Sequence, residues 1–166
     1  LVPRDRRKPY AVRQLINHVV DRGSFFELLR RYATGLVTGL ARLDGHVVGI
    51  YANDCRTYAG CLTADGSHKA RRFVELCETF HLPVIALVDE PGFMIGEEAE
   101  KAATIRHGTS AVLTVAQANV PWASVVVRKS FGVASAAHYG NEAYVLAWPS
   151  AELGALPVEG GVAVAY

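Results

Sequence analysis

The sequence has 166 residues, of which 51% are hydrophobic and 20% are charged, and its net charge is +1. This length and composition predict one soluble domain with a well-formed core, and the near-neutral charge gives no reason to expect a nucleic acid or an anionic membrane as partner. There is no apolar run as long as a membrane span, no signal peptide, and no arrangement of the three cysteines that suggests a disulfide framework or a zinc site. We therefore expect a cytoplasmic protein with reduced thiols and no metal.

The first half of the chain predicts a helix, a short strand, a hairpin and a second helix. Val12, Leu15, Ile16 and Val19 recur at the spacing of one helix face. Asp44-Gly45 separates two apolar runs, which is the strongest short-range hairpin signal. In order, we expect helix 11–22, strand 25–29, hairpin strands 36–43 and 46–52, a loop over 59–67, and helix 67–81.

The second half alternates strands and helices, which favours parallel βαβ units and an α/β fold. A long helix over 99–119 is expected to turn Ile105, Val112, Leu113 and Ala116 inward. The expected strands are 84–88, 123–127, 144–148 and 151–156.

Two of these strands, 84–88 and 123–127, each end in a glycine-containing loop that leads to a helix. Loops at the carboxyl ends of parallel strands are where such folds bind ligands. Gly92-Phe93 and Gly132-Val133-Ala134 are therefore expected to face each other across one crevice. Two backbone donors from two loops would form an oxyanion hole.

The stretch from Val125 to Gly140 carries the second loop. Its polar corner, 128–132, precedes small residues that predict a helix start, where backbone N–H groups are unpaired and favour negative charge. A second interpretation stays open, in which small residues only let a helix pack closely against the sheet.

A series of short motifs, each weak alone, is specific in this order and spacing. The motifs are Arg7-Lys8-Pro9-Tyr10, 39–45, 48–53, 59–62, Val88-Asp89-Glu90-Pro91-Gly92-Phe93, Ile105-Arg106-His107-Gly108, Arg128-Lys129-Ser130-Phe131-Gly132 and 147–152. On these motifs the sequence resembles the carboxyltransferase (beta) subunit of biotin-dependent acyl-CoA carboxylases, of the propionyl-CoA and acetyl-CoA carboxylase type. The resemblance is to the C-terminal of that subunit's two crotonase-like halves and covers nearly the whole chain.

The resemblance implies an α/β crotonase-like fold, with helices packed on parallel ββα units, and a carboxyltransferase that moves carboxylate from carboxybiotin to the α-carbon of an acyl-CoA. Residues 1–10 would be a linker from a missing N-terminal half, and residues 11–166 the C-terminal domain, truncated at its C-terminus. A biotin carboxylase or biotin carrier partner would bring the biotin. Active sites would lie at the interfaces of a homo-oligomer, so we expect the fragment alone to be weakly active or inactive.

The resemblance also implies which residues form the site. The family's Gly-Gly-Ala-Tyr corner falls on 132–135, so the donors would be the N–H groups of Val133 and Ala134, with a further one from Gly92 or Phe93. Ser135 and His138 would contact substrate. Three departures put the choice of substrate in doubt: Val133 replaces the second glycine, 135–138 replaces a tyrosine-containing run, and Met94-Ile95 replaces Leu-Pro.

Two other functions stay open. One is a free-standing crotonase-type hydratase, isomerase or decarboxylase of acyl-CoA, for which Glu97, Glu98 and Glu100 are candidate acid–base carboxylates, although acidic residues at a helix start are more often solvated. The other is a non-catalytic assembly module. We expect a structural or subunit-contact role for Arg106-His107-Gly108, and we expect Cys61 to be a buried, unreactive thiol.

Overall fold

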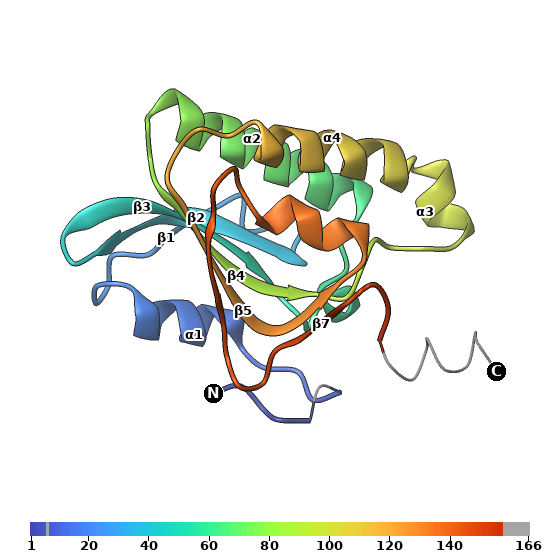
Figure 1. The fold of residues 1–166 in the computed structure, drawn as a ribbon, viewed down its shortest axis with the longest axis horizontal. Helices are drawn as coiled ribbons and strands as arrows, with labels where there is room; N and C mark the ends of the chain where they lie inside the picture. The colour runs from blue at the N-terminus through green and yellow to red at the C-terminus, as the bar shows by residue number, and fades with distance from the viewer. Residues whose placement is uncertain (6, 158–166) are drawn as a thin grey trace.

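The fold is a twisted sheet with helices on both faces (Figure 1). A computed structural model describes residues 1–5 and 7–157. The part of the expected domain beyond residue 157 lies outside the described residues. The helices are α1 (Val12–Val19), α2 (Ala64–Thr79), α3 (Glu97–Lys101) and α4 (Thr104–Ala116), with 3₁₀ helices η1 (Tyr58–Gly60) and η2 (Val133–His138). The strands are β1 (Phe26–Leu28), β2 (Leu36–Leu43), β3 (His46–Asn53), β4 (Val84–Glu90), β5 (Trp122–Phe131), β6 (Tyr144–Ala147) and β7 (Glu152–Gly154).

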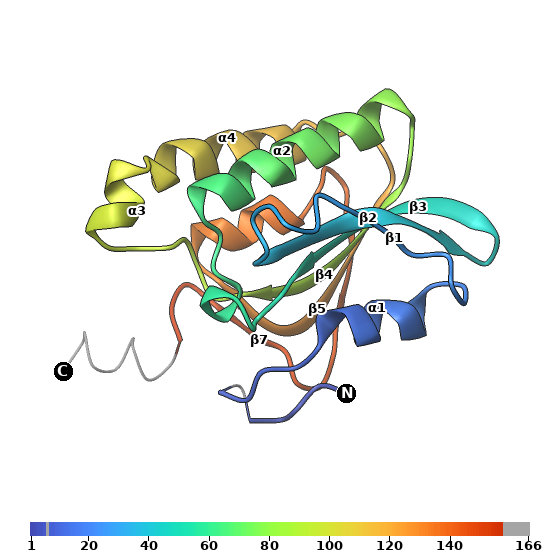
Figure 2. The ribbon, with the colours of Figure 1, turned by 180° about the vertical axis from the view of Figure 1, so that it is seen from behind.

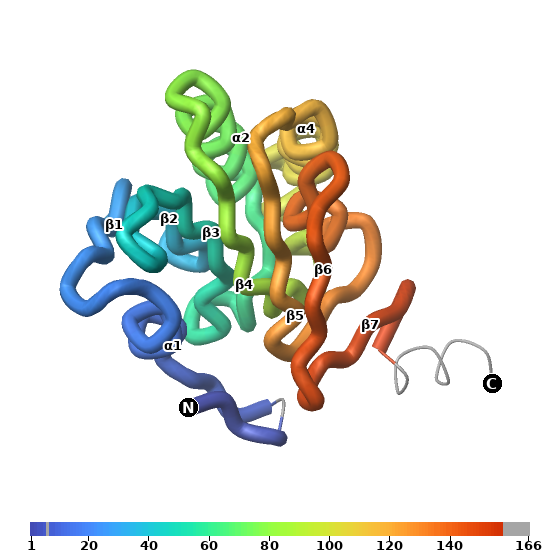
Figure 3. Tube along the Cα trace, turned by 60° about the vertical axis from the view of Figure 1, so that its left-hand side comes forward, coloured from blue at the N-terminus to red at the C-terminus, as the bar shows by residue number. Residues whose placement is uncertain are grey.

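The sheet runs in the order β1-β2-β3-β4-β5-β6, and β7 pairs with the far end of β5. The pairs β1–β2 and β2–β3 are antiparallel, and the expected hairpin is confirmed, because Asp44 and Gly45 both have positive φ and connect Leu43 to its partner His46. From β3 onward every pair is parallel. Figure 3 shows β4, β5 and β6 side by side. In the chain α2 lies between β3 and β4, α4 between β4 and β5, and η2 between β5 and β6. The prediction of parallel units in the second half is therefore correct.

Both faces of the central strands are buried, as parallel strands require. Helices α2 and α4 cover one face and α1 covers the other (Figures 1 and 2). The larger core lies under α2 and α4 and includes Tyr51, Phe73 and Val115, all of them at most 4% exposed. The second core joins Ile16 of α1 to β2, β3 and β4.

Strand β6 forms one edge of the sheet and is the most exposed strand of the fold. It pairs with β5 alone, through Ala123 to Val126. All four of its residues are exposed, and Tyr144, Val145 and Leu146 are 68%, 49% and 46% exposed. Large apolar side chains on an edge strand are unusual, because unpaired strand edges attract further strands.

The prediction of one long helix over 99–119 is wrong in two respects: the segment forms two helices, and most of the expected inward residues are exposed. Ala103 adopts a left-handed conformation, with φ of 54°, and separates α3 from α4. The buried residues of α4 are Thr104, Gly108, Ala111 and Val115, whereas Ile105, Leu113 and Ala116 are exposed. Of the expected inward residues only Val112 faces inward, since it is half-buried and packs against a small buried apolar cluster.

Other boundaries also differ from expectation. The 59–67 loop is shorter than expected, since α2 begins at Ala64 with the Thr63 hydroxyl accepting a hydrogen bond from the N–H of Gly66. Strand β5 continues through the polar segment 128–131, which the sequence predicts as a turn. Arg128 and Lys129 are buried there because Asp89 of β4 compensates their charge, and the Ser130 hydroxyl is hydrogen-bonded to that of Tyr139.

Candidate functional site

The two expected loops lie at the same end of the sheet, where the neighbouring strands β4 and β5 have their carboxyl ends. Strands β4 and β5 are parallel neighbours, with Val88 opposite Val126 and Glu90 opposite Ser130. Each therefore delivers its loop at its carboxyl end, β4 to Pro91–Gly96 and β5 to Gly132 and η2 (Figure 1).

The loop after β5 presents two unpaired backbone donors. Gly132 has φ of 62° and ψ of −166°, a region open in practice only to glycine. Val133 is not among the residues with positive φ, so it replaces the family glycine without strain. Neither the N–H of Val133 nor that of Ala134 donates a hydrogen bond to another described residue. Val133 is 71% exposed, whereas Ala134 is fully buried, so η2 is open to solvent at Val133 only.

The loop after β4 presents one such donor, on Phe93. An isolated parallel bridge joins Phe93 to Leu62, in which the N–H of Leu62 donates to the carbonyl of Gly92 and the N–H of Met94 donates to the carbonyl of Leu62. By strand alternation the N–H of Phe93 points away from Leu62, and it has no partner among the described residues. The N–H of Gly92 donates to Oε1 of Glu90 at 2.9 Å. Of the two donors expected here, Phe93 is thus the one that is not already used.

The two loops share one small apolar cluster. Leu62, Ala134 and Ala137 are buried together, and the Phe93 side chain packs against them. On its other side the Phe93 ring fills the space above Gly108 of α4, where a Cβ would lie 2.5 Å from Cζ of the ring. The glycine of the Arg106-His107-Gly108 motif therefore has a packing role, since it makes room for the Phe93 ring.

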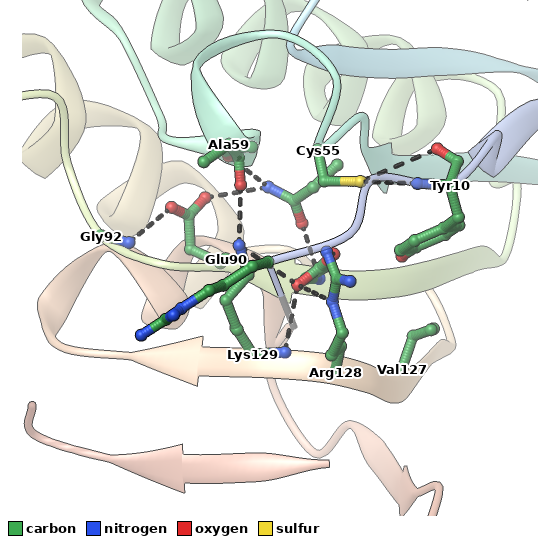
Figure 4. Close-up of polar contacts among 12 residues, drawn as sticks. Tyr10, Cys55, Ala59, Glu90, Gly92, Val127, Arg128 and Lys129 are labelled. Carbon is green, nitrogen blue, oxygen red and sulfur yellow. Dashed lines mark hydrogen bonds and ion pairs between the residues drawn. The ribbon is translucent and has the colours of Figure 1, made fainter. Parts of the chain in front are cut away.

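A buried ionic cluster lies directly before both loops (Figure 4). Asp89 is fully buried, accepts from Nη2 of Arg128 at 2.9 Å, and lies 3.7 Å from Nζ of Lys129. Burial alone would lower the pKa of Arg128, but the attraction of Asp89 outweighs it and raises that pKa. Arg128 Nη1 also donates to the carbonyl of Lys8 at 2.7 Å, and the guanidinium lies 4.9 Å from the centre of the Tyr10 ring. Arg128 thereby ties the N-terminal segment to β5.

Glu90 and His138 form a second buried pair, and sequence reasoning missed the role of Glu90. Both side chains are 0% exposed, and Nε2 of His138 lies 3.2 Å from Oε2 of Glu90. The same oxygen accepts from Nδ2 of Asn53 at 3.0 Å. His138, expected to contact substrate, therefore points into the interior, while Ser135 is half-buried and donates its hydroxyl to the carbonyl of Gly132 at 2.7 Å.

A cavity of about 690 Å³ lies beside the loop after β4. It is lined by segments 31–36, 57–66 and 94–104, with Asn53. None of the seven expected site residues lines it, but Met94 and Leu62 connect its wall to Phe93. Cys61 also lines this cavity, and burial together with the nearby Glu90 charge raises the pKa of its thiol. This thiol is therefore poorly suited to act as a nucleophile.

The acidic residues after Gly96 do not form a converging pair. Glu97 and Glu98 are 81% and 88% exposed, and each forms an ion pair with Lys101 on the surface of α3. Glu100 is exposed as well. Within residues 1–5 and 7–157, no group of three or more metal-ligating side chains is placed to hold a metal ion, and none of the described helices is long and apolar enough to cross a bilayer.

Comparison with known proteins matches the whole chain. Residues 1–166 match the family model described as carboxyl transferase domain. The chain is 39% identical over 170 residues to the propionyl-CoA carboxylase carboxyltransferase subunit of Haloferax mediterranei, and covers 33% of that protein. It is 41% identical over 170 residues to the methylmalonyl-CoA carboxyltransferase 12S subunit of Propionibacterium freudenreichii subsp. shermanii, and covers 32% of it. In both cases all of this chain is aligned, so it spans about a third of the length of these relatives.

The fold is likewise that of solved carboxyltransferases. A crystal structure of transcarboxylase 12S, described as a hexamer assembly with hydrolysed methylmalonyl-coenzyme A bound, superimposes with a TM-score of 0.95 at 42% identity. The match covers 99% of this chain and 32% of that one. The expected α/β crotonase-like fold is therefore confirmed.

Proposed function

Because this chain belongs to the carboxyl transferase domain family, we propose that it supplies the half of a biotin-dependent acyl-CoA carboxyltransferase that receives carboxybiotin. The whole enzyme would move carboxylate from carboxybiotin to the α-carbon of an acyl-CoA. The observation that carries this proposal is the set of unpaired backbone donors at one sheet edge, on Phe93, Val133 and Ala134.

These donors fit an anionic biotin ring. Biotin, carried on a partner subunit or domain, supplies the carboxyl group and a ureido nitrogen that can take up the α-proton of the acyl-CoA. This chain's part is to stabilise negative charge on the ureido oxygen, which backbone N–H groups do without any change in protonation. Each such donor contributes about 10²- to 10³-fold in rate in well-studied enzymes. No acidic or basic side chain of this half has to act.

The rest of the site would come from outside this chain. We propose that the acyl-CoA is bound by the other half of a longer subunit, and that active sites form between copies in a homo-oligomer. In this view residues 1–10 lead in from the other half and 11–166 form this domain. The open start of η2, next to the exposed Val133, suits closure by a neighbouring chain. A biotin carboxylase or biotin carrier would be the second partner, and we place the enzyme in the cytoplasm.

The two alternatives receive less support. A hydratase needs two carboxylates that converge on the substrate, and Glu97 and Glu98 instead bind Lys101 on the surface. An assembly module would be expected to cap its loop donors with its own atoms, whereas the N–H groups of Val133 and Ala134 have no partner among the described residues.

The test removes one donor without disturbing the loop. Val133→Pro deletes the N–H at the first position of η2, where proline is tolerated because its φ already suits a helix start. Val133→Ala is the matched control, since it shortens the same exposed side chain and keeps the N–H.

Both variants are introduced into the full-length subunit, assembled with its biotin-bearing partner, and acyl-CoA carboxylation is measured. We expect Val133→Pro to lose about 10²- to 10³-fold in kcat and Val133→Ala to stay within about threefold of wild type, since it keeps the donor. Equal activity of the two variants would refute the role of this donor.

A further inference from the structure

The carboxylate of Glu90 contacts both donor-bearing loops at once. Its Oε1 accepts from the N–H of Gly92 at 2.9 Å, one residue before the donor on Phe93. Its Oε2 lies 3.2 Å from Nε2 of His138, the last residue of η2. Figure 4 shows Glu90 turned toward Gly92 from the end of β4. Glu90 thus joins the loop that follows it to His138, which is 48 residues further along the chain.

His138 is fixed from several directions, so its bond to Glu90 holds η2 firmly. Its carbonyl accepts from Nε1 of Trp122 at 2.9 Å and from Oγ of Ser124 at 2.7 Å. Its ring packs against the ring of Tyr51, with centroids 4.9 Å apart. The position of η2 relative to β5 is therefore determined at its C-terminal end by polar contacts, whereas Val133 at its N-terminal end is exposed.

A buried polar pair is a costly way to hold a core together. Replacing such a pair by apolar residues of similar volume is often neutral or stabilising, because desolvation offsets the attraction. Glu90 also accepts from Nδ2 of Asn53 at 3.0 Å, so both carboxylate oxygens are fully used. These contacts fit a positioning role. Two of the three bonds end on Gly92 and His138, in or beside the two donor loops, and the third comes from Asn53 of β3.

We propose that Glu90 and His138 are positioning residues, which together form a clasp that fixes the distance between the Phe93 donor and the Val133 and Ala134 donors. The proposal rests on the proposed function, because it assigns the clasp to the oxyanion-binding loops. It also gives His138 a role that differs from substrate contact. A misplacement of about 1 Å at a reacting centre can cost about 10²-fold in rate, so loosening the clasp should appear in kcat.

The test replaces the clasp by an apolar pair. Glu90→Leu/His138→Leu in the full-length subunit removes both loop contacts and keeps the interior filled. Glu90→Gln is the partial rescue variant. Its amide oxygen still accepts from Gly92 and its amide N–H₂ can donate to His138, so both loop contacts stay, and only the bond from Asn53 is lost. Tyr51→Phe is the control, since the Tyr51 hydroxyl touches the same region but has no hydrogen-bond partner among the described residues.

Two readouts are measured in the assembled enzyme. Amide hydrogen exchange at 92–94 and 133–138 reports how readily the two loops open. Steady-state kinetics separates an effect on kcat from an effect on KM. In the double variant we expect faster exchange in both segments, a fall in kcat of about 10- to 100-fold, and a KM for acyl-CoA within about threefold, because the acyl-CoA is bound elsewhere. Tyr51→Phe should resemble wild type, and Glu90→Gln, which keeps both loop contacts, should be closer to wild type than the double variant in both exchange and kcat.

Unchanged exchange in the double variant, or faster exchange with wild-type kcat, would overturn the proposal. A wild-type assembly without carboxyltransferase activity would instead refute the proposed function, and the exchange measurement would then decide alone whether the clasp holds the loops. Should the double variant fail to fold, His138→Phe keeps the ring, removes the bond to Glu90 and carries the same test.

Discussion

Gly108→Ala perturbs the donor loop from a distance, through the Phe93 ring. A Cβ at this position would lie 2.5 Å from Cζ and 3.0 Å from Cδ1 of the ring, and closest to Cε1. To reach an ordinary contact of 3.4 Å, the ring must retreat by about 1 Å. It has little room to do so, because its far side packs against Leu62, Ala134 and Ala137.

Two effects of opposite sign decide the stability of this variant. Alanine is a better helix former than glycine, which favours Gly108→Ala by about 1 kcal/mol. Overpacking a filled core costs about 1–3 kcal/mol. Since the clash falls on a packed ring rather than on a flexible chain end, we expect the cost to exceed the gain, with a net loss of up to about 2 kcal/mol.

Urea unfolding of the Gly108→Ala chain measures that loss, with Thr109→Ala on the exposed side of the same helix as control. In the full-length enzyme the displaced Phe93 donor should lower kcat by up to about 10²-fold. A variant that is more stable than wild type and fully active would show that the ring moves freely, and would refute this reasoning.

Three further predictions concern buried groups and backbone conformation. Asp89→Asn leaves Arg128 and Lys129 without a compensating charge and should cost about 3–5 kcal/mol in the free energy of unfolding. Gly132→Ala should cost about 1–3 kcal/mol in urea unfolding from backbone strain alone, because the nearest atom to the added Cβ is 3.6 Å away. Burial lowers the pKa of Lys69 from 10.5 to about 8. Since the unfolded chain then binds more protons between those pH values, wild-type stability should rise by about 3 kcal/mol from pH 8 to pH 10.5 relative to Lys69→Met.

Each of these predictions has a clear contrary result. A cost below about 1 kcal/mol for Asp89→Asn would mean that the cluster is solvated, and Glu98→Gln, in an exposed ion pair, is its control. A Gly132→Ala chain as stable as wild type would show that the loop relaxes out of its glycine conformation. Parallel pH profiles of wild type and Lys69→Met would place the pKa of Lys69 at its ordinary value.

Local signals allowed much of the fold to be predicted. The Asp44-Gly45 hairpin and the alternation of strand and helix after residue 83 each depend on residues close in sequence. The inner face of α4 is predicted wrongly because the apolar residues are taken to face the core. The buried positions are instead Thr104, Gly108, Ala111 and Val115, of which three are small or polar.

Contacts between distant residues explain what was missed at the site. Arg128, Lys129 and Ser130 are typical of a turn, and only the charge of Asp89 on β4 makes it favourable to bury the two cations in β5. The contact between Glu90 and His138 spans 48 residues, and no local pattern signals it. Sequence reasoning did place the two loops, but it could not show that Gly92 is already bonded while Phe93 is not.

The exposed edge strand β6 has a practical consequence for anyone who produces these 166 residues by themselves. Tyr144, Val145 and Leu146 are exposed to solvent on this edge strand. We therefore expect the purified polypeptide to self-associate and precipitate as its concentration rises. Val145→Lys should reduce this self-association, because a charge on an edge strand opposes pairing with another copy. Light scattering of wild type and Val145→Lys at matched concentration would measure the difference.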